Sequence, residues 1–247
     1  MELAVLSLAP GLALGSFLNV VAARVPRRRS IVQPASACME CGTPLAWRDN
    51  IPLLSWVLLR GRCRHCGTSI SPLYPGVELA TALLVAACVI DFGLSGRFVV
   101  AAFFCAVLVA VTATDLTHRI IPNRIVVPAA AVILVAQTAL EPSPQWTLGA
   151  LGASGFLFLA VLAYPAGMGM GDVKLALVMG AALGKTVPVA LMLGMLTALV
   201  PSIILLARYG SAARKMGIPF GPFLALGSVV ALFFGEQIVD WYLALLT

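Results

Sequence analysis

Residues 98–119 read FVVAAFFCAVLVAVTATDLTHR. No charged residue occurs between Phe98 and Thr114, and the run then ends in Asp115. An α-helix needs about 20 apolar residues to cross the hydrocarbon core of a bilayer, and this run comes close to that length. The segment therefore predicts a membrane-spanning helix with a carboxyl group near one end.

Apolar runs of similar length recur along the chain. Of the 247 residues, 61% are hydrophobic and only 11% are charged, which is too little charge for the surface of a water-soluble domain of this size. We predict an all-α polytopic membrane protein with about eight transmembrane helices. The expected spans are 3–23, 74–92, 98–114, 125–140, 147–164, 173–184, 188–207 and 221–245.

The basic residues indicate the orientation of these spans. Of the 16 Lys and Arg, only Arg97 and Lys185 fall on one side of the membrane, and the rest, including Arg214 and Lys215, fall on the other. Because cytoplasmic loops carry an excess of Lys and Arg, we place both termini outside and the basic side in the cytoplasm. The net charge of +6 then reflects topology and attraction to membrane lipid, so no nucleic-acid partner is expected.

The first apolar run carries its basic cluster after it and not before it. A secretory signal peptide has the opposite order, so we expect residues 3–23 to be a membrane span.

Residues 24–73 form a polar insert between the first two spans, and it contains two C-x2-C motifs that are each followed by glycine. This pattern predicts a tetrahedral zinc site, with Gly42 and Gly67 allowing the tight turns. Zinc would be structural here, because a small insert has little core of its own. Two disulfides are the alternative, which a reducing cytoplasm disfavours. The four candidate ligands are Cys38, Cys41, Cys63 and Cys66.

Two acidic residues are expected at the same depth, at the cytoplasmic ends of their helices: Asp115, and Asp172 in Gly169-x-Gly171-Asp172. Two adjacent carboxyl groups share a proton and act as general base and general acid around a water, as in aspartic proteases. The two glycines remove side-chain bulk near Asp172. Helix dipoles favour Asp172, at a helix start, as the anion and Asp115, at a helix end, as the acid.

Other interpretations of these residues are open. Each Asp would otherwise cap a helix or pair with a nearby Lys or Arg. A proton- or cation-coupled transporter, or an assembly scaffold, would also place acids at membrane depth. Ser154 sits in a Gly-x-Ser-Gly pattern but has no histidine expected within reach, and the His-Glu-x-x-His motif of zinc proteases is absent.

Several motifs, in order along the chain, resemble those of type IV prepilin peptidases. They are Gly15-Ser-Phe-Leu-Asn19, the paired C-x2-C insert with Asn50-Ile-Pro-Leu-Leu-Ser-Trp56, Ser71-Pro-Leu-Tyr74-Pro-Gly-Val-Glu78, the Asp115 segment with Ile121-Pro-Asn123, Gly169-x-Gly171-Asp172 and Ile218-Pro-Phe-Gly-Pro-Phe.

The resemblance implies an intramembrane aspartic endopeptidase of the bacterial inner membrane, with Asp115 and Asp172 as the catalytic pair. It implies cleavage of the basic leader of prepilins or pseudopilins after Gly, then methylation of the new N-terminus with S-adenosylmethionine. The division it implies is a first helix (1–23), a methyltransferase-associated zinc insert (24–73) and a peptidase domain (74–247). A peptidase without methyl transfer stays an alternative.

The remaining site residues follow from this resemblance and from charge. The basic leader would dock on a cytoplasmic face that is itself basic, so the few acidic residues there should bind it. These docking candidates are Glu40, Asp49 and Glu78. The methyl-transfer candidates are Gly61, Arg62 and Glu78, with Glu78 otherwise only anchoring the insert. The family often has Lys where this chain has Arg62, and Arg keeps the charge but not the geometry, which makes methyl transfer a weaker expectation than cleavage.

Overall fold

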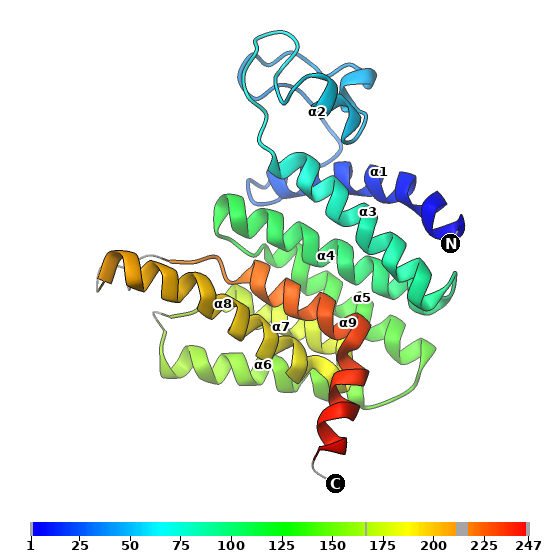
Figure 1. Cartoon of the computed structure of the whole chain (residues 1–247), viewed down its shortest axis with the longest axis vertical. Coiled ribbons are helices and arrows are strands. Elements are labelled where there is room, and N and C mark those ends of the chain that lie inside the picture. Colours follow the sequence, from blue (N-terminus) through cyan, green and yellow to red (C-terminus); the bar gives the residue numbers. More distant parts are fainter. Residues whose placement is uncertain (1, 166, 211–216, 246–247) are drawn as a thin grey trace. The chain divides into compact units, whose positions relative to one another are not determined.

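The structure is a computed structural model that describes residues 2–165, 167–210 and 217–245. Within these ranges the secondary structure is helical, with no β-strand, as predicted (Figure 1). The chain forms two compact units, Met1–Phe98 and Val99–Thr247. Arg214 and Lys215, which contributed to the expected orientation, lie outside the described residues.

The first unit is built on α1 (Glu2–Arg24) and α3 (Leu73–Phe92), which pack along each other. The two backbones come very close, since a Cβ added to Gly15 would lie 2.6 Å from the Cα of Glu78. Small residues allow such close helix contacts in membranes. Between α1 and α3 lies the insert, which contains η1 (Trp47–Asn50) and α2 (Leu54–Leu58).

The second unit contains most of α4, which begins just before the division, and six further elements. Within it, α7 packs against α5, α6, α8 and α9, and its Leu175, Ala176 and Met179 are fully buried. The α7 helix is therefore the centre of this unit. The elements are α4 (Gly96–His118), α5 (Asn123–Leu140), α6 (Gln145–Ala163), α7 (Met170–Leu183), η2 (Gly184–Thr186), α8 (Val187–Tyr209) and α9 (Gly221–Ala244).

Each of the eight expected spans coincides with one helix of the described chain, with ends that differ by a few residues. Seven helical segments are long and apolar enough to cross a membrane, and one of them, Met170–Tyr209, contains both α7 and α8. The chain is a multi-pass membrane protein. At about 1.5 Å per residue, the 14 residues of α7 rise about 21 Å, which is shorter than the about 30 Å hydrocarbon core.

The backbones of α6 and α7 come closest at Gly149 and Gly180. A Cβ on Gly180 would overlap the carbonyl group of Gly149, whereas Gly152 and Gly155 have no neighbour near their Cβ positions. The Ser154 hydroxyl donates to the Ala150 carbonyl of its own helix at 2.8 Å. Ser154 is thus engaged with helix backbone, and its surroundings do not resemble those of an activated nucleophile.

Candidate active site and metal centre

Asp115 lies in the last turn of α4, three residues before the helix ends at His118. Its side chain is buried, with 6% of the residue exposed. The carboxylate atom Oδ2 accepts a hydrogen bond of 2.9 Å from the backbone N–H of Gly221, the first residue of α9. Asp115 is therefore held by a second helix that lies far away in the sequence.

Asp172 is the third residue of α7 and is also buried. Its Oδ2 accepts a hydrogen bond of 3.2 Å from the N–H of Gly169, whose carbonyl accepts from the N–H of Asp172 at 3.1 Å. This reciprocal contact closes the first turn of α7 and fixes the Asp172 side chain. The capping role considered for Asp172 is thus real, but it uses only one of the two carboxylate oxygens.

The two glycines beside Asp172 have different neighbours. A Cβ at Gly171 would lie 2.9 Å from the Cβ of Ile121, so the residue makes room for the connection between α4 and α5. A Cβ at Gly169 would meet only the Asp172 carboxylate at 3.6 Å and the Gly171 N at 3.8 Å. Gly169, unlike Gly171, therefore has no neighbour from another helix or loop near its Cβ position.

The two carboxylates are near enough for the charge of Asp115 to act on Asp172, and the charge of Arg119 acts on Asp115. Neither forms an ion pair with any Lys or Arg that the structure describes. Lys174, the cation next along α7, donates to the Asn123 side chain at 2.9 Å instead. Two neighbouring buried acids that form no ion pair do not readily ionise together, and the sharing of one proton between them stays a prediction.

The expected division of roles between the two acids rested on helix dipoles. Asp172 lies at the N-terminus of α7, as expected, and Asp115 near the C-terminus of α4. However, Asp115 also faces the N-terminus of α9 through the N–H of Gly221. Since a helix N-terminus favours an anion, α9 opposes the effect of α4, and the assignment of base and acid stays a prediction.

The two C-x2-C motifs adopt the same local structure. In each, the glycine after the second cysteine donates its N–H to the carbonyl of the first cysteine at 3.0 Å, from Gly42 to Cys38 and from Gly67 to Cys63. Both glycines have positive φ, +69° and +72°, which L side chains rarely adopt. The pattern of tight turns expected for a metal knuckle is therefore present twice.

The two knuckles bring four cysteines together, and their sulfurs all lie within 4.8 Å of one another. The Sγ atoms of Cys38 and Cys66 are 3.8 Å apart, which matches the edge of a tetrahedron with about 2.3 Å metal–sulfur bonds. None of these four cysteines forms a disulfide. Backbone N–H groups of Cys66 and His65 lower the pKa of the Cys63 thiol, which favours the thiolate that a metal needs. This cluster can hold a metal ion.

Replacing Cys63 with serine is expected to lower the bound metal by about tenfold or more, because a serine hydroxyl does not supply the deprotonated ligand that a tetrahedral site requires. Elemental analysis of the purified protein measures this directly. Cys105→Ala, in α4, is the matched loss of a cysteine outside the cluster and should leave the metal content unchanged. Full metal content in Cys63→Ser would show that these four sulfurs are not the ligands.

Glu78 lies near the start of α3, and only 8% of it is exposed. Its Oε2 accepts a hydrogen bond of 2.8 Å from the N–H of Leu53, the residue that precedes α2. Leu53 has φ +60°, an unfavourable conformation for leucine, so the hydrogen bond holds the insert in a strained turn. Of the two roles considered for Glu78, the structure shows this anchoring contact.

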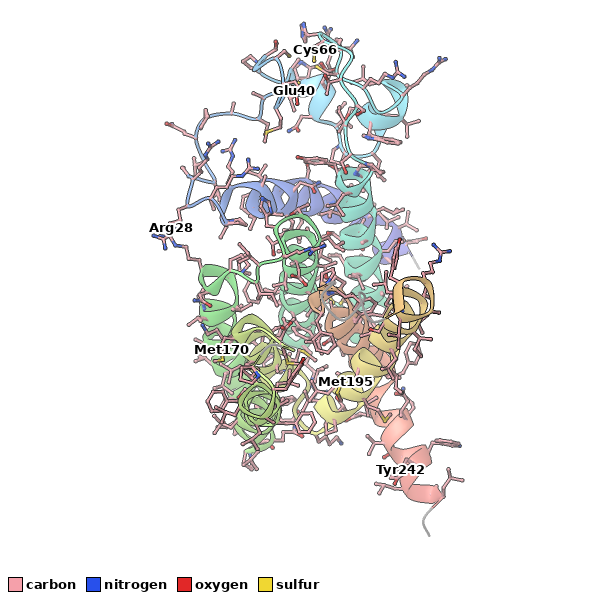
Figure 2. The ribbon with its side chains drawn as sticks, turned by 90° about the vertical axis from the view of Figure 1, so that its left-hand side faces the viewer. Arg28, Glu40, Cys66, Met170, Met195 and Tyr242 are labelled. Atoms are coloured by element: carbon pink, nitrogen blue, oxygen red, sulfur yellow. The ribbon has the colours of Figure 1, made fainter. Side chains whose placement is uncertain are left out.

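The other acidic candidates differ in their surroundings. Asp49 receives hydrogen bonds from Nε and Nη2 of Arg64, the shortest at 2.7 Å, and this guanidinium holds the pKa of the carboxyl below its usual range. Glu40 is exposed and lies near Cys66 at the same end of the insert (Figure 2). Asp49 is thus already neutralised, whereas no described cation forms an ion pair with Glu40.

Gly61 and Arg62, the candidates beside the second knuckle, lie in different environments. Gly61 is buried with φ +67°, and a Cβ there would lie 2.9 Å from the ring of Trp56. Arg62 is exposed and pairs with Ser69 in an isolated β-bridge. Gly61 therefore makes room for the Trp56 ring, and Arg62 is exposed to solvent.

Two family descriptions match this chain. Residues 10–92 match the bacterial peptidase A24 N-terminal domain, and residues 102–203 match the type IV leader peptidase family. The chain belongs to the type IV leader peptidase family. The matched ranges include every acidic and cysteine residue that the site contains, but they end before Gly221.

Similar full-length proteins carry one name, prepilin leader peptidase/N-methyltransferase. The protein of Bacillus subtilis (strain 168) is 38% identical over 243 residues, which cover 94% of this chain and 95% of that protein. Those of Aeromonas salmonicida (strain A449) and Xanthomonas campestris pv. campestris are 33% and 35% identical, over 94% of this chain and 91% and 92% of their own lengths. No solved structure matches this leader peptidase family member.

Sequence reasoning assigned no role to Gly221 in this peptidase. The residue stands in the quoted segment Ile218-Pro-Phe-Gly-Pro-Phe, and a glycine followed by proline at a predicted helix start was the available signal. What the sequence could not show is that the N–H of Gly221 reaches a carboxylate 106 positions away.

Proposed function

We propose that this chain cleaves the leader from type IV prepilins or pseudopilins with Asp115 and Asp172, and then methylates the new N-terminus. The observation that best supports peptidase activity is the pair of buried, neighbouring carboxylates, each fixed through Oδ2 by a backbone N–H. Membership of the type IV leader peptidase family and the names of the relatives support the substrate.

In this mechanism, the reacting water binds between the two carboxyl groups. The ionised Asp takes a proton from the water while the water oxygen bonds to the carbonyl carbon of the scissile peptide. The protonated Asp then gives its proton to the leaving nitrogen as the C–N bond breaks. The products are a leader with a new carboxylate and a pilin with a free amine, and the pair again holds one shared proton.

The methyl-transfer half rests on the relatives' name and on the first unit. When bound, S-adenosylmethionine supplies the methyl group that the new amine accepts, and the amine loses a proton in exchange. We assign zinc to the four-cysteine cluster, since four thiolates at tetrahedral spacing are typical of a structural zinc site. We retain 1–23, 24–73 and 74–247 as the functional division of the chain. A peptidase that lacks methyl transfer is the second candidate.

The membrane setting completes the proposal. An excess of Lys and Arg on one side supports an inner-membrane protein with both termini outside and with the insert and both acids toward the cytoplasm. Since Asp49 is paired with Arg64, exposed Glu40 is the better docking site for a basic leader. Anionic lipid would accompany the basic face.

The test uses the purified full chain in lipid, a pilin precursor with a basic leader, and labelled S-adenosylmethionine. Mass spectrometry is expected to show loss of the leader and then addition of one methyl group. Leader loss without methylation would support the peptidase-only alternative. An intact precursor, together with proton or cation flux through the same vesicles, would contradict the proposal and favour a transporter.

A further inference from the structure

The first unit contains a cavity of about 420 Å³ that the peptidase mechanism does not use. Its walls come from the C-terminal end of α1, the N-terminal end of α3 and the insert between them. Cavities that bind small molecules and cofactors typically measure about 300–1,000 Å³, so this one has the size for a single small ligand.

One wall of the cavity carries a buried acid. Glu78 is 92% buried, and no Lys or Arg among the described residues forms an ion pair with it. Its Oε2 is held by the N–H of Leu53, yet a carboxylate has about four acceptor positions, so capacity remains. An acid kept in such a place favours a ligand that brings a cation or hydroxyl donors.

A cation stands at the same cavity. Arg24, at the end of α1, donates to the carbonyl groups of Ser30 and Pro34, at 3.1 and 2.7 Å, and pairs with no described acid. By contrast, Asp49 and Arg64, which also line the cavity, neutralise each other. The charged lining residues that form no ion pair among the described residues are therefore two acids, buried Glu78 and exposed Glu40, and one cation, Arg24.

The cavity is also lined by two aromatic residues, Trp56 and Tyr74. The indole N–H of Trp56 donates to the Ile70 carbonyl at 3.1 Å, and its ring lies against Gly61. Tyr74, on the next wall, has its backbone carbonyl held by the Asn19 side chain at 3.0 Å. A flat aromatic ligand group stacks on surfaces of this kind.

The knuckles contribute to the same walls. Cys38 and Cys63, one from each motif, line the cavity. A metal held by the four sulfurs would therefore fix this wall as well as the knuckles, which joins the metal site to the ligand site.

We propose that this cavity is the binding site for the methyl donor, S-adenosylmethionine. The donor has a cationic amino acid part with a carboxylate, a ribose with two hydroxyl groups, and an adenine ring. The ammonium group of the donor matches Glu78, and its carboxylate matches Arg24, neither of which has an ion-pair partner among the described residues. The adenine ring matches the aromatic side chains of Trp56 and Tyr74. The inference rests on the methyl-transfer half of the proposed function.

The experiment measures binding and not turnover. Purified full chain carrying Asp172→Asn is dialysed to equilibrium against labelled S-adenosylmethionine, with unlabelled S-adenosylhomocysteine as competitor. We expect saturable binding, and a Kd raised by about tenfold or more in Glu78→Gln, which loses a charged acceptor. Asp91→Asn, at the other end of α3 and outside the cavity, is the matched control and should bind normally.

A second variant separates loss of the site from loss of the fold, because Glu78→Gln also weakens the contact with Leu53. Ala23→Phe fills the cavity from α1 and leaves Glu78 and Leu53 in place. If Ala23→Phe melts like the parent and binds the donor tenfold more weakly, the assignment is supported. Wild-type affinity in Ala23→Phe, or no donor binding by the parent, overturns it. If the wild-type chain binds the donor but cleaves no pilin precursor, the proposed function is contradicted while the binding-site assignment stands.

Discussion

Gly221→Ala is expected to lower kcat/KM for leader cleavage by about 100-fold or more. The N–H of Gly221 is the donor that fixes Oδ2 of Asp115, and an added Cβ would lie 2.8 Å from that oxygen and 3.4 Å from the Asp115 Cβ and Cγ. Either the start of α9 or the carboxylate must move. A displacement of about 1 Å at a catalytic group costs about 100-fold in rate, which is the basis of the magnitude.

Two glycines offer matched controls for this variant. At Gly217, in the same connection, an added Cβ would approach only the Arg119 guanidinium, at 4.0 Å, and at Gly152, in α6, it would meet nothing within 4 Å. Both alanine variants should cleave at nearly the wild-type rate. The assay is steady-state cleavage of a pilin precursor, with thermal melting to confirm folding. Wild-type cleavage by Gly221→Ala would show that the contact with Asp115 has no catalytic importance.

The positions of the helices followed from the sequence because the bilayer dictates them. A chain in lipid must satisfy its backbone hydrogen bonds internally, so each apolar run of sufficient length becomes a helix. The end of α4 was harder to place. Hydropathy ends the span at Thr114, but the backbone continues as helix to His118, because polar residues such as Thr117 do not stop a helix on leaving the apolar core.

The candidate site was predictable as a set of residue types but not as a set of contacts. Asp115 and Asp172 stand out because carboxylates are rare in apolar runs. The contacts that hold them are tertiary, as with the N–H of Gly221, and the space at Gly171 turns out to be occupied by Ile121. No local pattern encodes either distance.

The insert shows the same division between local and tertiary information. The spacing of Cys38, Cys41, Cys63 and Cys66 predicted a cluster, because a C-x2-C motif followed by glycine has one favourable turn. The link from Glu78 to Leu53 was not predictable, since it joins residues 25 apart across an irregular loop. The pairing of Asp49 with Arg64 likewise emerged only from the structure.

Asparagine at either acid is expected to abolish cleavage, with kcat/KM lowered by about 1,000-fold or more. The amide of Asn has nearly the shape of the carboxyl group and can still accept from Gly221 or Gly169, but it cannot exchange a proton with water or with the leaving amine. Asp115→Asn and Asp172→Asn should therefore fold like the parent and fail in the same step. Their melting temperatures in lipid provide the check on folding.

The most direct test of the central claim compares these two variants with the wild type in two assays. One assay measures leader release from an intact pilin precursor, and the other measures methylation of a pre-cleaved pilin by labelled S-adenosylmethionine. The account predicts that neither variant releases the leader, while both still methylate the pre-cleaved pilin, because the acids serve only the peptidase. Leader release at the wild-type rate by a folded Asp115→Asn or Asp172→Asn protein would contradict the aspartyl pair as the catalytic centre.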